Sequence, residues 1–81
     1  MKIFLSQKAL NDYAKLTKEL QKTANKQFAL LLKNLNYPSL RAKKHDETKD
    51  VWQARVNKNY RFYFRIAGDV YEIITIIKHL K

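Results

Sequence analysis

The sequence predicts an α+β fold in which two helices pack against an antiparallel sheet. Apolar residues in the first half of the chain recur at three- and four-residue spacing, which is typical of amphipathic helices. The second half alternates apolar and polar residues in runs rich in Val, Ile, Tyr and Phe, which is typical of strands. A chain of 81 residues suffices for one small core, so residues 1–81 are expected to form a single domain.

The N-terminal half is predicted to be a short strand followed by a helical hairpin. The strand is Lys2 to Leu5, and Ser6 follows it at an N-cap position. The first helix is expected from Gln7 to about Lys22, and Thr23 is expected to cap the second. The apolar stripes are Leu10, Tyr13, Leu16 or Thr17, and Leu20 in the first helix, and Ala24, Phe28, Leu31, Leu32 and Leu35 in the second. Neither helix can bury its stripe against the other alone, so both need a sheet to cover.

The connection to the C-terminal half begins at Tyr37-Pro38, because proline disfavours helical backbone in the preceding residue. Ser39 to Asp46 alternates apolar residues with Arg and Lys, which favours an edge strand whose charges prevent unwanted pairing. Glu47 to Asp50 is a polar turn. A basic strand is therefore expected at the border of the sheet.

Three successive strands are predicted to form an antiparallel meander: Val51 to Asn57, Tyr60 to Ile66 and Val70 to Lys78. They are joined by turns at Asn57-Lys58-Asn59 and Ala67-Gly68-Asp69, the second of which holds the only glycine, where positive φ is easiest. The last strand is apolar on both faces, which indicates an interior position in the sheet. Alternation therefore does not assign its faces.

Alternation does assign the faces of the first two meander strands. The core face comprises Trp52, Ala54, Val56, Tyr60, Phe62, Phe64 and Ile66. The solvent face carries Val51, Gln53, Arg55, Asn57, Arg61, Tyr63 and Arg65. With 17 Lys and Arg against seven Asp and Glu, a net charge of +10, this second face is expected to meet a polyanion.

The composition narrows the classes of function. The chain has no Cys, which excludes disulfides, thiolate metal sites and a Cys nucleophile. Nothing in the sequence indicates a metal site or a cofactor. The longest apolar runs, FALLL and IITII, are far shorter than the roughly 20 residues of a membrane span, so a soluble cytoplasmic protein without a membrane partner is expected. Nucleic acid and an acidic protein are the expected partners.

The order of these elements, together with three local features, resembles the RelE/ParE family of bacterial type II toxins over essentially the whole chain. The features are the W-x-x-R-V segment from Trp52 to Val56, the Tyr60-Arg61 pair that opens an aromatic strand, and the basic residue with His79 at the end of the last strand. The resemblance implies a RelE-like microbial ribonuclease-type fold. It also implies a toxin neutralised by an acidic, partly disordered cognate antitoxin.

The resemblance leaves two activities open. Many family members are metal-independent endoribonucleases that cut mRNA in the ribosomal decoding site and so inhibit translation, whereas the ParE branch inhibits DNA gyrase without catalysis. The ribonuclease members carry an Arg matching Arg61, a basic residue or His matching His79, and often a tyrosine shortly afterwards. Here Leu80 and Lys81 follow His79, and this departure keeps gyrase inhibition as the alternative to the first hypothesis, ribosome-dependent mRNA cleavage.

The candidate catalytic residues are Arg61, His79 and Arg55. Cleavage through the 2′-hydroxyl needs a base, an acid and positive charge at the phosphate. Arg61 is expected to stabilise the transition state and His79 to act as acid or base. Arg55 either clamps a phosphate or holds a nearby Asp, and Arg65 is expected to be solvated.

Binding of mRNA and ribosomal RNA is assigned to Arg41, Lys43, Lys44, His45, Tyr63 and Lys78. The cationic members would neutralise phosphates without reading sequence. Tyr63 can stack on a base, and His45 can serve as a second acid or base. The alternatives are a charged edge strand for the run from Arg41 to His45 and an amphipathic rim position for Tyr63.

Overall fold

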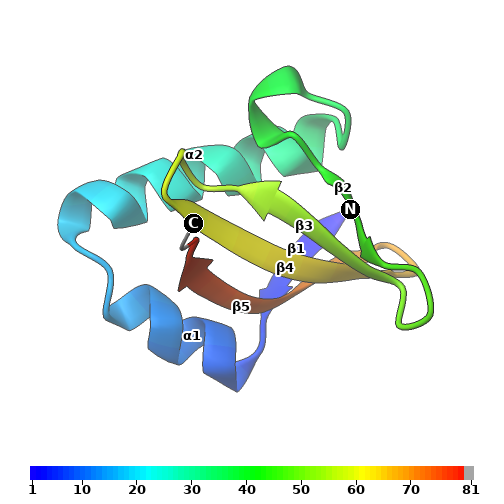
Figure 1. Ribbon diagram of the computed structural model, residues 1–81, viewed down its shortest axis with the longest axis horizontal. Helices are drawn as coiled ribbons and strands as arrows, with labels where there is room; N and C mark the ends of the chain where they lie inside the picture. The colour runs from blue at the N-terminus through cyan, green and yellow to red at the C-terminus, as the bar shows by residue number, and fades with distance from the viewer. Residues whose placement is uncertain (80–81) are drawn as a thin grey trace.

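The computed structural model describes residues 1–79 and shows a five-stranded sheet with two helices (Figure 1). The sheet has the order β1-β5-β4-β3-β2, in which β1 runs parallel to β5 and the other neighbours are antiparallel. The predicted α+β class and the meander are confirmed. The elements are β1 (Lys2–Leu5), α1 (Gln7–Ala14), α2 (Lys18–Lys33), a 3₁₀ turn (Pro38–Leu40), β2 (Lys43–Asp46), β3 (Val51–Arg55), β4 (Tyr60–Ala67) and β5 (Val70–Lys78).

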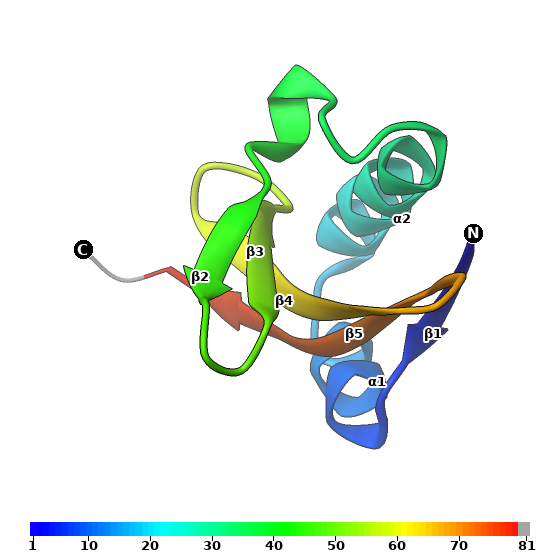
Figure 2. The ribbon, with the colours of Figure 1, turned by 90° about the vertical axis from the view of Figure 1, so that its right-hand side faces the viewer.

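The core lies between the helices and one face of the sheet. Phe28 of α2 meets Phe62 of β4 edge to face, with ring centroids 5.1 Å apart, and Phe62 packs in turn on Phe64. Both β4 rings are fully buried, as alternation predicts. Figure 2 shows α1 and α2 on one side of the molecule and β2 and β3 on the other, with no helix over these two strands. In the part of the chain that the structure describes, the face of the β2–β3–β4 region that points away from α1 and α2 therefore carries no helix.

The break between the two helices falls earlier than the sequence predicts. α1 ends at Ala14, and Thr17 caps α2 by accepting a hydrogen bond from the Leu20 amide at 3.2 Å. Thr23, the expected cap, lies inside α2 and donates its hydroxyl to the Glu19 carbonyl. The prediction of one helix to Lys22 was wrong because the apolar spacing continues across the break.

Two leucines assigned to the apolar stripes are exposed. Leu10 of α1 is 49% exposed and Leu32 of α2 is 43% exposed, whereas Ala9 of α1 is fully buried. The short α1 presents a small residue to the sheet. Tyr13 of the same helix is partly buried against the core.

A β-bulge explains why alternation could not assign the faces of β5. Tyr63 lies opposite Thr75, but the next residue, Phe64, lies opposite Ile73, so Ile74 is the additional residue. The bulge shifts the buried positions from odd to even numbers, and the buried residues of β5 are Tyr71, Ile73 and Ile76. The predicted interior position is confirmed, since β5 lies between β1 and β4.

The edge of β5 beyond β1 is completed by side chains from the start of the chain. β1 pairs with β5 only as far as Ile73. Beyond that point, the Ser6 hydroxyl donates to the Ile74 carbonyl at 2.7 Å, and the Asp12 carboxylate accepts from the Thr75 hydroxyl at 2.5 Å and the Ile76 amide at 3.1 Å. Ser6 also caps α1, as predicted. These bonds satisfy backbone groups that a longer β1 would otherwise pair.

The segment from Ser39 to Asp46 is a strand only in its second half. Pro38–Leu40 forms a 3₁₀ turn, Leu40 is fully buried, and β2 starts at Lys43. β2 is an edge strand, as expected. Within the part of the chain that the structure describes, no helix is long and apolar enough to cross a membrane.

Candidate anion-binding site

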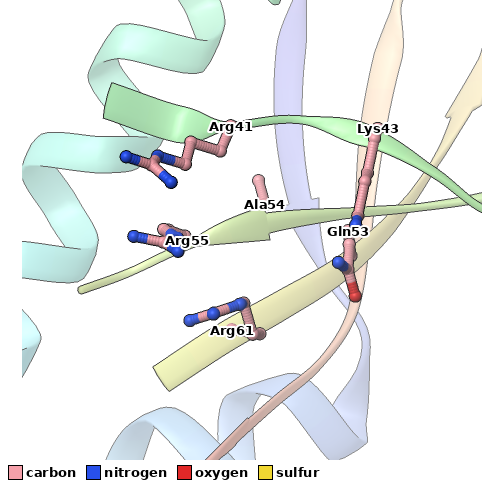
Figure 3. Close-up of a pocket in the computed structure, with 6 residues that line it drawn as sticks. All are labelled: Arg41, Lys43, Gln53, Ala54, Arg55 and Arg61. Atoms are coloured by element: carbon pink, nitrogen blue, oxygen red, sulfur yellow. The ribbon is translucent and has the colours of Figure 1, made fainter. Parts of the chain in front are cut away.

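Three arginines gather around an open cavity on the sheet face that carries no helix. Arg41 follows the 3₁₀ turn, Arg55 ends β3 and Arg61 opens β4. Arg55 and Arg61 are direct partners across the β3–β4 ladder. Figure 3 shows the three guanidinium groups one above the other and directed to the same side. The cavity, of about 270 Å³, is lined by Arg41, Lys43, Gln53, Ala54, Arg55 and Arg61.

The backbone of Arg41 helps to bring its side chain to this group. Arg41 has φ 47° and ψ 43°, the left-handed conformation that non-glycine residues rarely adopt. The chain turns there from the 3₁₀ segment into β2. Strained backbone of this kind persists where surrounding contacts hold it in place, and it is frequent at functional sites.

The arginine cluster has no carboxylate partner among residues 1–79. Burial lowers the pKa of Arg55, and the charges of Arg41 and Arg61 lower it further. Two acidic side chains of β2 and its turn are engaged elsewhere: Asp46 accepts from Thr48 and Lys49, and Asp50 pairs with Lys44. Like charges held opposite one another destabilise a sheet, so the arrangement favours an anion that offsets the repulsion.

Arg61 is buried, although alternation placed it on the solvent face. It is only 8% exposed, because its Nη1 donates to the carbonyls of Asn57, Lys58 and Tyr60 at 3.1 to 3.4 Å. Its Nε and Nη2 make no hydrogen bond within the described chain. The guanidinium group is therefore fixed at one nitrogen and keeps donors for a bound anion.

A residue that the sequence interpretation missed holds Arg55 in position. The side-chain amide of Gln27, on α2, donates to the Arg55 carbonyl at 2.9 Å and to the Ser39 carbonyl at 3.3 Å, and Gln27 is 6% exposed. It thus joins α2 to the end of β3 and to the 3₁₀ turn before Arg41. The signal was available, since Gln27 occupies a stripe position next to Phe28 and a polar residue there needs a buried partner.

His79 lies beside the same turn that Arg61 contacts. Its backbone amide donates to the Asn59 carbonyl at 2.6 Å, which extends the β4–β5 ladder by one step beyond Tyr60 and Lys78. The His79 side chain is exposed. Two of the three predicted catalytic residues thus adjoin the β3–β4 turn, and the third, Arg55, precedes it.

The other predicted binding residues divide between the two faces. Lys43 lines the cavity, and His45 meets Tyr63 edge to face with ring centroids 4.8 Å apart. Lys44 does not join them, because its ammonium pairs with Asp50 and lies 5.4 Å from the centre of the Trp52 ring. Lys78 does not join them either, because its partner in the β4–β5 ladder, Tyr60, lies on the core face of the sheet.

Arg65 is exposed and lies opposite Glu72, toward the far end of β4. This position agrees with the expectation that it is solvated. In residues 1–79 no group of three His, Asp or Glu side chains has the geometry of a metal site.

Comparison with known proteins identifies the family to which this chain belongs. Residues 3–81 match the family model described as the ParE toxin of the type II toxin-antitoxin system parDE. No curated protein sequence matches the chain.

Similar solved structures include the YoeB/ParE toxin from Agrobacterium tumefaciens, 16% identical with a TM-score of 0.80, covering 99% of this chain and 100% of that one. YoeB in the YoeB-YefM complex from Staphylococcus aureus is 18% identical with a TM-score of 0.78, covering 96% and 95%. The isolated E. coli RelE toxin is 16% identical with a TM-score of 0.76, covering 98% and 84%. At these identities the likeness shows the fold alone.

Proposed function

We propose that this chain, which belongs to the ParE toxin family of type II toxin-antitoxin systems, is a toxin that cuts mRNA on the ribosome without a metal ion. The resemblance to RelE/ParE toxins inferred from Trp52 to Val56 and from Tyr60-Arg61 is confirmed at the level of the family. The cytoplasm is the corresponding site of action. The observation that carries the proposed activity is the cluster of Arg41, Arg55 and Arg61 around an open cavity without a carboxylate partner among residues 1–79.

In this proposal the arginines act on the scissile phosphate. Attack of the 2′-hydroxyl on phosphorus concentrates negative charge on the phosphate oxygens, and donors already held in place stabilise that charge without reorganising. The guanidinium group of Arg61 is held by the β3–β4 turn, and Gln27 holds the backbone of Arg55. His79 acts as acid or base, since a positioned imidazole can accept or donate the transferred proton. Arg41 and Lys43 bind neighbouring phosphates.

The same surface is the proposed contact for an acidic antitoxin. YoeB from S. aureus forms a complex with YefM, and RelE from E. coli forms one with its antitoxin RelB. A net charge of +10 on 81 residues favours an acidic partner here too. Such a partner would neutralise the toxin by occupying the arginine cluster.

The activity is tested by expressing the toxin without antitoxin and mapping mRNA ends by primer extension. The wild type is expected to produce discrete cuts within translated frames, and Arg55→Ala to reduce cutting by about 100-fold or more, the usual effect of removing one transition-state donor. Arg65→Ala is the matched control, since it removes an arginine from the same sheet away from the cavity. Growth arrest with intact mRNA would contradict the proposal.

Inhibition of DNA gyrase is the second candidate function, and the matched ParE family model favours it. Ribonuclease members often carry a tyrosine shortly after the position of His79, whereas Leu80 and Lys81 follow it here, and this departure points the same way. This mode of action predicts a DNA-damage response, inhibited supercoiling by purified gyrase and uncut mRNA. Supercoiling assays on the purified toxin separate the two candidates.

A further inference from the structure

Two aromatic side chains meet on the solvent face of the sheet, outside the hydrophobic core. His45 of β2 and Tyr63 of β4 lie edge to face with ring centroids 4.8 Å apart, and neither belongs to the core cluster. His45 is exposed and Tyr63 half-buried. Burial in the core therefore does not account for this pair.

The pair reaches across an intervening strand. β3 separates β2 from β4, and strands two apart in a sheet are roughly 10 Å apart. The β2–β3 register shifts between Lys44 and Asp46, so His45 lies in a bulge, a feature that redirects a side chain. The bulge brings His45 over β3 to Tyr63. The two rings form an aromatic surface above the middle of the sheet.

The Tyr63 end of this aromatic surface lies one cross-strand row away from the arginines of the cavity. The ladder places Lys43, Gln53 and Tyr63 in one cross-strand row, and Arg55 and Arg61 in the next. The two rows are two residues apart along each strand, or about 7 Å. A nucleotide holds its base and its phosphate one sugar apart, so a phosphate at the arginines would place its base over this row.

Polar groups between the rings and the cavity are free to bind a base edge. The Gln53 amide lines the cavity and makes no hydrogen bond within residues 1–79, and the Tyr63 hydroxyl makes none there either. An amide offers both a donor and an acceptor, the combination with which Gln reads bases. The cations that line the adjoining cavity favour a nucleic acid over an apolar ligand.

We propose that Tyr63 and His45, with the amide of Gln53, form a nucleobase subsite beside the Arg41–Arg55–Arg61 cavity. The subsite takes one base of a single-stranded RNA whose phosphate occupies the arginines, so the inference rests on the proposed function. The base stacks on the aromatic surface, and the stacking tolerates different bases because each has a π face. The arginines supply affinity for phosphate, and the aromatic pair distinguishes a nucleotide from a bare phosphate chain.

Fluorescence anisotropy with two labelled probes tests the subsite. One is a 2′-O-methyl RNA trinucleotide, which cannot be cleaved, and the other an abasic analogue with the same number of phosphates. The wild type is expected to bind the trinucleotide about 5- to 150-fold more tightly, the range for stacking one base. Tyr63→Leu should abolish the difference and Tyr63→Phe should retain it. His45→Ala should reduce it, and Tyr37→Leu, at an exposed tyrosine outside the site, should leave it unchanged.

The outcomes separate the subsite from the proposed function. Equal binding of both probes by a wild type that cuts mRNA would overturn the subsite and leave the cleavage proposal standing. Failure of Arg55→Ala to weaken binding of the abasic probe would overturn the phosphate site. Variants of Tyr63 that weaken binding of the antitoxin but not of the trinucleotide would assign the aromatic pair to a protein interface instead. The wild-type comparison needs no substitution, so misfolding of a variant cannot obscure it.

Discussion

Gln27 of α2 and Arg55 of β3 are joined by a hydrogen bond of 2.9 Å from the Gln27 side-chain amide to the Arg55 carbonyl. The same amide donates to Ser39, so a single buried side chain fixes the end of β3 and the turn before Arg41. The helical half of the molecule is thereby tied to the backbone of Arg55 and to the turn that precedes Arg41. A substitution at Gln27 should therefore alter the geometry of the arginine cluster.

Gln27→Leu is expected to lower the free energy of unfolding by about 1 to 3 kcal/mol, because two carbonyls lose a buried donor. It should also weaken anion binding, since the Arg55 and Arg41 backbones lose their tie to α2. Urea denaturation followed by circular dichroism measures the first effect. Gln7→Leu is the control, because Gln7 is exposed and, within residues 1–79, its side chain bonds only Asn11. Equal midpoints for the two variants would contradict the positioning role.

Thr17 and Thr23 distinguish the observed helix boundary from the expected one. Thr17→Ala should cost about 1 kcal/mol, the usual effect of removing an N-cap. Thr23→Ala should cost little, because Thr23 lies inside α2 and Ala has the higher helix propensity. Thermal unfolding of the two variants checks this order. A greater loss of stability in Thr23→Ala than in Thr17→Ala would indicate that α2 begins at residue 23.

Stability should fall in acid through Asp12. Burial opposes ionisation of this carboxyl, but the hydrogen bonds from Thr75 and Ile76 and the charge of Lys8 outweigh it and lower the pKa below 3.8. Because the folded pKa is depressed, the stabilisation is fully present above the unfolded value near 3.8 and is lost as the pH falls through the folded value. Denaturant titrations between pH 2 and 7 should show a steeper acid limb for the wild type than for Asp12→Asn. Asp69→Asn, which changes an exposed carboxylate, should leave the slope as it is.

The arginine cluster should destabilise the free toxin in a salt-dependent manner. Arg55→Gln removes one of three facing cations, so its thermal midpoint should exceed that of the wild type at low ionic strength. The gain should vanish near 1 M NaCl, where the screening length is about 3 Å. Arg65→Gln, opposite Glu72, should show no such gain. A lower midpoint for Arg55→Gln at every salt concentration would show that Arg55 is not repelled by its neighbours.

The sequence by itself determined the fold class, the bounds of β5, the core face of β3 and β4, and the family. These features repeat over many residues: alternation along a strand and spacing along a helix report burial directly, and a family pattern extends through the whole chain. The cationic face was predictable on the same ground. Arg55 and Arg61 lie on it because they alternate with Ala54 and Phe62.

Tertiary structure alone decided the features that depend on one contact between distant residues. The bulge at Ile74 reverses the faces of β5, and the Ser6 and Asp12 bonds to that region join residues more than 60 positions apart. Arg61 is buried because the β3–β4 turn presents its carbonyls to the guanidinium group. Arg41 reaches the cavity through one left-handed residue, and Gln27 holds Arg55 from another element. A single hydrogen bond or backbone angle leaves no periodic trace, so these positions become visible only once the chain is folded.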